Sequence, residues 1–174
     1  KTAPVVEAAA ETAAAPEALL KKLAANALDK KEFAAQIAKH GKSGVALCVE
    51  KLSDYHLRDH LKPILAAMGA PALRPLLEKS GDYLVSYEIR EVLEAMDRGV
   101  LARLADELAR FEDEKILEFI LYTIGRLKIQ AARERVVPFL NHDSMSVRFQ
   151  AKRTLTELGL DNAEIEMLRD KAAD

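Results

Sequence analysis

The feature that most constrains this chain is an internal period of 28 residues. Gly41, Gly69, Asp97 and Gly125 follow one another at this spacing, and the next matching glycine, Gly159, comes 34 residues later. Apolar residues repeat in the same register, in four columns: Leu61, Ile89 and Leu117; Ile64, Val92 and Ile120; Leu65, Leu93 and Leu121; and Met68, Met96 and Ile124. The fourth unit continues these columns with Ala151, Leu155 and Leu158. A unit this short buries its apolar face only against its neighbours, so the period predicts a stack of similar units.

The columns are spaced by three, four and seven residues, which places them on one face of a helix. Strong helix formers dominate the chain, and 7 Gly and 6 Pro are too few for the turns of an all-β protein. We therefore expect an all-α fold with two helices in each unit. The first helices are expected over 43–52, 71–80, 98–111 and 131–140, and the second over 55–68, 83–97, 113–125 and 144–158.

Polar residues mark the ends of these helices. Asp54, Asp82, Asp113 and Ser144 stand where an N-cap would accept hydrogen bonds from free backbone N–H groups. The glycine at the end of a unit suits the left-handed residue that closes a helix.

The chain divides into a tail and one repeat domain. Residues 1–16 are rich in Ala and Pro and are interpreted as a tail or linker. Residues 17–174 are expected to form a right-handed α-solenoid of stacked helical hairpins, with a weaker hairpin over 17–41, repeats over 42–69, 70–97, 98–125 and 126–159, and a polar capping helix over 162–172. We favour a linker to an upstream domain over the remnant of a cleaved signal peptide. We expect a cytoplasmic protein, with a processed exported protein as the alternative.

The last unit resembles a HEAT repeat. The similar features are Pro138 in the first helix, Asp143 in the turn, the pair Val147-Arg148, and then Ala151, Leu155 and Gly159; Arg74-Pro75-Leu76-Leu77 repeats the proline placement of Val137-Pro138-Phe139-Leu140. The resemblance extends over about 42–159, and the short units are similar to the compact HEAT-like repeats of bacterial proteins. It implies a stack whose second helices line the inner, concave side, and a tendency to bind other macromolecules. A fold alone does not name the partner.

The residue content disfavours catalysis, metal binding and membrane insertion. His56 and His60 share a helix face, but no third ligand has a metal-site spacing, so we expect no metal. Cys48 lies in an apolar stretch and is expected to be a buried, inert thiol. The longest uninterrupted apolar runs have five residues, far fewer than a membrane span of ~20 requires. We expect a protein without enzymatic activity or cofactor.

The candidate partner-binding residues lie on the second helices, opposite the core columns. They are Tyr87, Glu91, Lys115, Phe119, Tyr122, Phe149 and Arg153. Aromatic and arginine side chains in a groove are typical of binding hot spots. The alternative is that Phe119 and Tyr122 pack between neighbouring helices. Glu114 and Arg148 occupy one repeat column, which predicts an ion pair between adjacent second helices.

These observations favour a non-enzymatic interaction or scaffold module that binds a protein or peptide on its concave face. A nucleic-acid module similar to HEAT-like DNA glycosylases is the first alternative, but it needs a basic groove. The net charge of −2 and the absence of Trp disfavour it. A chromophore lyase with short HEAT-like repeats is a remoter alternative, and the chain offers no residue set for the attachment chemistry.

Overall fold

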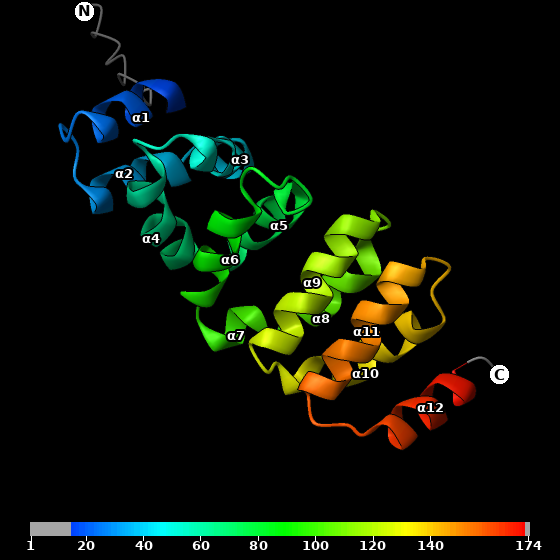
Figure 1. The fold of residues 1–174 in the computed structure, drawn as a ribbon. Helices are drawn as coiled ribbons and strands as arrows, with labels where there is room; N and C mark the ends of the chain where they lie inside the picture. The colour runs from blue at the N-terminus through cyan, green and yellow to red at the C-terminus, as the bar shows by residue number, and fades with distance from the viewer. Residues whose placement is uncertain (1–14, 173–174) are drawn as a thin grey trace, which may run out of the picture.

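The computed structural model describes residues 15–172, and the regular secondary structure of that part is helical without a strand, as expected (Figure 1). Of the expected tail, residues 1–14 lie outside the described part, and Pro16 already opens the first helix. The α-helices are α1 (Pro16–Ala24), α2 (Lys30–Ala38), α3 (Gly41–Glu50), α4 (Arg58–Met68), α5 (Ala70–Lys79), α6 (Ser86–Glu94), α7 (Arg98–Leu101), α8 (Leu104–Glu107), α9 (Glu114–Arg126), α10 (Arg133–Val136), α11 (Met145–Glu157) and α12 (Asn162–Lys171). Short 3₁₀ segments cover Lys51–Ser53, Leu108–Arg110, Gln130–Ala132 and Val137–Asn141.

The helices follow one another along the molecule, and those of corresponding units lie in two rows. We call the second helices, α4, α6, α9 and α11, one row and the first helices, α3, α5, α8 and α10, the other (Figure 1). Contacts join α4 to α6 and α9 to α11 in the first row and α3 to α5 and α8 to α10 in the second, and α5 contacts α9. Two hydrogen bonds show that α9 and α11 run in the same direction. Ser144 Oγ donates to Glu114 Oε2 where both helices start, and Thr154 Oγ1 donates to the Leu121 carbonyl further along both. The hairpin α1–α2 packs at the beginning of the rows and α12 at their end.

Tertiary contacts recur at nearly the sequence period. Hydrogen bonds between neighbouring units join residues 28 to 33 positions apart, at Arg58–Glu88, Lys62–Glu91, Arg74–Glu107, Glu94–Arg126, Glu114–Ser144, Glu118–Ser146 and Leu121–Thr154. Residues about one sequence period apart are therefore neighbours at these positions.

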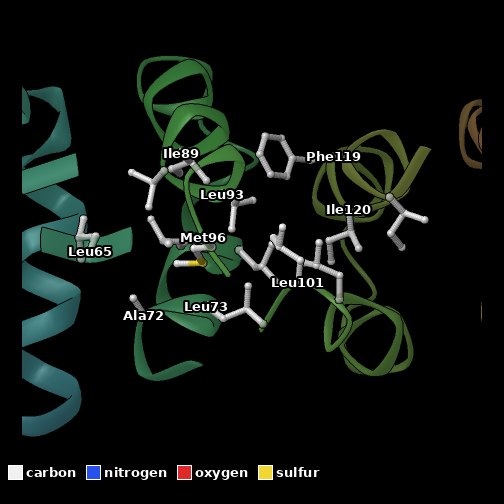
Figure 2. Packing of buried hydrophobic residues seen from close by; sticks show 14 of the residues in the cluster. Leu65, Ala72, Leu73, Ile89, Leu93, Met96, Leu101, Phe119 and Ile120 are labelled. Atoms are coloured by element: carbon white, nitrogen blue, oxygen red, sulfur yellow. The ribbon is translucent and has the colours of Figure 1, made fainter. Parts of the chain in front are cut away.

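The core is one continuous apolar cluster. Leu65, Leu93, Leu121 and Leu155 each have 0% exposure and all belong to it, which confirms the expected apolar columns. Figure 2 shows how the cluster passes from one unit to the next: Leu65 of α4 lies on one side of Ile89 and Leu93 of α6, and Ile120 of α9 on the other. Each unit buries its apolar helix face against the neighbouring unit, and this burial stabilises the fold.

The caps follow the prediction only in part. Asp113 accepts from the Ile116 N–H at the start of α9, as expected. Asp54 and Asp82 accept instead from N–H groups two residues on, in turns that precede α4 and α6. Ser144 lies at the N-cap of α11, but its hydroxyl accepts no hydrogen bond from the backbone of that helix; it donates to Glu114 Oε2 at 2.7 Å.

Two of the expected unit-closing residues have another role. Gly41, Gly69 and Gly159 have positive φ, as predicted, whereas Gly125 lies inside α9 and Asp97 caps α7. The left-handed residue after α9 is Lys128, with φ of 54°. Gly125 is needed for space, because a Cβ there would meet Glu157 and come within 3.3 Å of the Thr154 backbone.

The first helices of the last two units are broken. The helix expected over 98–111 is interrupted after Leu101 and again at the 3₁₀ segment Leu108–Arg110, and no helix-breaking residue type explains the first interruption. In the last unit α10 changes to the 3₁₀ segment Val137–Asn141 at Pro138, which lacks the N–H that an α-helix would use there.

Candidate functional site

The structure separates the expected partner-binding residues into four environments. Phe119 is only 8% exposed and belongs to the core, and Figure 2 shows its ring between α9 and the side chains of Ile89 and Leu93 on α6. Its assignment to a partner-binding face is thereby corrected: the spacing between α6 and α9 needs a large apolar side chain to fill it. Helical periodicity places Phe119 opposite the core columns, but it does not tell how far the next helix lies.

Glu91 is engaged in a bridge between helices. Its carboxylate accepts from Lys62 Nζ at 2.8 Å, and Lys62 also contacts Asp59 at 3.0 Å. The hydrogen bond from Lys62 lowers the pKa of Glu91 and of Asp59, and the hydrogen bonds to Glu91 and then to Asp59 raise the pKa of Lys62. Glu91 thus joins α4 to α6.

The pair expected between Glu114 and Arg148 is not formed. Arg148 Nη1 donates instead to the carbonyls of His142 and Asp143, both at 2.7 Å, and closes its own turn. Glu114 accepts from Ser144 at 2.7 Å. The expectation of a Glu114–Arg148 ion pair is wrong because the longer turn of the last unit offers Arg148 carbonyl partners nearer than the neighbouring helix.

Tyr87, Lys115 and Phe149 lie on the surface, at the N-terminal ends of α6, α9 and α11. Further apolar side chains are exposed at the same ends. We call these residues the aromatic ridge: Tyr55, Tyr83, Leu84, Tyr87, Met145 and Phe149, whose exposures run from 59% to 82%.

Contacts between neighbouring turns place the parts of the ridge in a row. Arg58 pairs with Glu88 at 3.1 Å and its guanidinium lies 4.9 Å from the centre of the Tyr55 ring, so the start of α4 adjoins the start of α6. The turn at Gly81 comes next to Lys115 on α9, since a Cβ on that glycine would lie 3.5 Å from the lysine Cβ. Ser144 then joins α11 to α9.

The ridge is acidic as well as apolar. Its turns and first helical turns, over 54–59, 82–88, 110–118 and 142–149, hold four Lys or Arg residues, Arg58, Arg110, Lys115 and Arg148, and nine carboxylates, Asp54, Asp59, Asp82, Glu88, Glu112, Asp113, Glu114, Glu118 and Asp143. Carboxylates are favourable at helix N-termini, where the macrodipole is positive. The surplus gives this end of the second helices a negative potential.

Tyr122 and Arg153 lie at the opposite end of the same row, in a pocket between α9 and α11. Its volume is about 260 Å³, and it is lined by Tyr122, Gly125, Arg126, Lys128, Arg153 and Glu157. We call it the Tyr122 pocket.

Cations outnumber carboxylates around this pocket. Arg126 pairs with Glu94 at 3.3 Å, and Arg153 pairs with Glu157 at 3.1 Å. The ammonium of Lys128 donates to the Glu157 backbone carbonyl, which carries no full charge. Arg90 lies with its guanidinium 4.9 Å from the centre of the Tyr122 ring, and its Nε is buried without a hydrogen-bond partner. Of these charged groups, the cations of Arg126, Lys128 and Arg153 and the carboxylate of Glu157 line the pocket.

Sequence reasoning did not find most of the ridge or of the pocket. For the ridge a signal exists: Tyr55, Tyr83, Phe111 and Met145 form one repeat column, four residues before the column of Tyr87, Lys115 and Phe149. For the pocket the signal is weaker, because Arg126, Lys128 and Glu157 come from two units and converge only when α9 and α11 pack together.

The thiol of Cys48 and the possible metal ligands are the other candidate groups from the sequence. Cys48 is fully buried, and burial raises the pKa of its thiol to about 12, so it stays protonated at neutral pH. Over 15–172, no cluster of three or more His, Cys, Asp or Glu side chains could hold a metal ion. In the same range no helix is long and apolar enough to cross a membrane.

Comparison with known proteins gives no relative: no family model, no curated protein and no solved structure matches this chain.

Proposed function

We propose that this protein is a non-enzymatic interaction module, built as a right-handed α-solenoid of HEAT-like hairpins with the second helices on its inner side. Support for the stack comes from the hydrogen bonds that join residues 28 to 33 positions apart and from the parallel course of α9 and α11. Each hairpin then adds a similar strip to one continuous surface.

The observation on which the proposal depends is the aromatic ridge. Tyr83 is 82% exposed, Met145 76% and Phe149 69%, in a chain with only 5% aromatic residues. Large apolar side chains gathered on a surface indicate a place where another molecule binds. Tyrosine, phenylalanine and methionine are also the types enriched in protein interfaces.

The surroundings of the ridge indicate the chemistry of the partner. Nine carboxylates against four Lys or Arg residues favour a basic protein segment and repel the phosphates of nucleic acid. A segment with apolar side chains on one face and Lys or Arg beside them would match both properties. We therefore propose a basic, amphipathic segment of another protein as the partner.

A selection from a library of displayed peptides tests this function. Peptides bound by the wild-type protein should be enriched in Lys, Arg and apolar residues, and binding should fall when Tyr87→Ser is combined with Phe149→Ser. Lys79→Ser, at the exposed end of α5, is the control and should leave binding unchanged. Enrichment of acidic peptides, or equal binding by the ridge variant, would contradict the proposal.

A further inference from the structure

We propose that the Tyr122 pocket binds a phosphomonoester, a dianionic group carried by a ligand distinct from the segment on the aromatic ridge. The inference does not depend on the proposed function, because the pocket lies at the C-terminal ends of α9 and α11 and the ridge at their N-terminal ends.

The charge balance of the pocket points to a dianion. The residues that line the pocket carry three positive charges, on Arg126, Lys128 and Arg153, and one negative charge, on Glu157, in a protein whose net charge is −2. Among the ion pairs of the described residues, none involves Arg90 or Lys128. A phosphomonoester carries a charge of about −1.5 to −2 at pH 7, which matches this excess.

The backbone around the pocket is shaped to hold these cations. Lys128 has φ of 54°, a conformation that glycine adopts far more easily, and its N–H closes α9 onto the Gly125 carbonyl. A lysine at this position keeps a cation at the rim at the expense of local strain, and such strain is concentrated at functional sites. The missing side chain of Gly125, which lines the pocket, lets Glu157 approach α9.

The polar groups of the pocket can also form directed hydrogen bonds to a phosphate. Arg126 and Arg153 bring guanidinium groups from two helices, and arginine binds phosphate oxygens through paired hydrogen bonds. Glu157 Oε2 is buried against Gly125, so this carboxylate is held at the side of α9. The volume of about 260 Å³ is below that of a drug-sized ligand site, as expected for a headgroup.

The test is a titration followed by NMR at constant ionic strength, with inorganic phosphate as the first probe and sulfate as the second. Saturable shifts are expected for the Nε–Hε signals of Arg126 and Arg153 and for the amides of Gly125 and Lys128. Chloride alone should give none of them. Shifts that grow without saturation, or equally with chloride, would overturn the proposal.

Variants connect the binding to the pocket. Arg126→Gln and Arg153→Gln should each weaken phosphate binding about tenfold, since each removes a charge-assisted contact. Both side chains are more than half exposed, so folding should persist, which circular dichroism checks. Arg135→Gln is the matched control, because this exposed arginine pairs with Asp106 in the other row of helices. Equal weakening by all three variants would show general screening of charge and refute the site.

Two further probes distinguish the source of the phosphate. If the group belongs to a protein, a phosphoserine peptide should bind more tightly than glycerol phosphate, and its unphosphorylated form should not bind. If it belongs to a small molecule, the two phosphorylated probes should bind alike. An unphosphorylated peptide that binds as well as the phosphorylated one would overturn the proposal.

Discussion

Phe119 and Phe149 offer a sharp test of how this repeat is built, because they are the same residue type on equivalent faces of two neighbouring helices. Phe119 is 8% exposed and fills the space between α9 and α6, whereas Phe149 is 69% exposed on the aromatic ridge. Both lie opposite the core columns by helical periodicity, so only packing separates them.

The expected magnitudes follow from that difference. Removal of a buried phenylalanine ring costs about 3–5 kcal/mol of folding free energy. The Phe119 side chain is still 8% exposed to solvent. Phe119→Ala should therefore cost about 3 kcal/mol of folding free energy, at the lower end of this range. Phe149→Ala removes a side chain that is 69% exposed and should change stability by less than about 0.5 kcal/mol. For a chain of this size, the fall in Tm should be about 6–12 °C for Phe119→Ala and about 1–2 °C at most for Phe149→Ala.

Chemical unfolding in urea, followed by circular dichroism at 222 nm, measures both variants. The m-value must stay constant for the two free energies to be comparable. If Phe119→Ala costs less than about 1 kcal/mol, the packing between α6 and α9 described here is refuted. Equal losses for the two variants would place Phe149 in the core and remove it from the ridge.

Three other changes test the remaining parts of the structure. Leu121→Ala and Leu93→Ala, at fully buried positions, should each lower the free energy of unfolding by about 2–5 kcal/mol, measured by the same urea titration. Thr154→Val removes the hydroxyl that donates to the Leu121 carbonyl at 2.8 Å and should cost about 1 kcal/mol, whereas Thr156→Val, at an exposed position, should cost less. Glu91→Gln should lower Tm at neutral pH, because the pKa of Glu91 is lower in the folded protein than in the unfolded chain; the stabilisation exists above the unfolded pKa and disappears as the pH falls through the folded one. A Tm difference between wild type and this variant that does not shrink on acidification would show that the Lys62–Glu91 bridge contributes nothing.

The sequence alone determined the helical fold and the face that each second helix buries. The 28-residue columns predicted the four fully buried leucines, because apolar spacing of three, four and seven is a property of one helix and does not depend on its neighbours. Gly69 and Gly159 follow the ends of α4 and α11 with positive φ, as expected, for the same reason: backbone conformation is a local property.

Tertiary structure decided what happens on the other face. Phe119, Tyr122 and Phe149 look alike in a helical projection, yet the first is core, the second is half-buried in a pocket and the third is exposed. The distance between neighbouring helices separates them: α9 packs closely on α11, where Gly125 admits Glu157, and reaches α6 through the ring of Phe119. The distance between two helices depends on the side chains that both units place between them. The sequence of one repeat therefore does not predict which of its outward-facing residues will be buried.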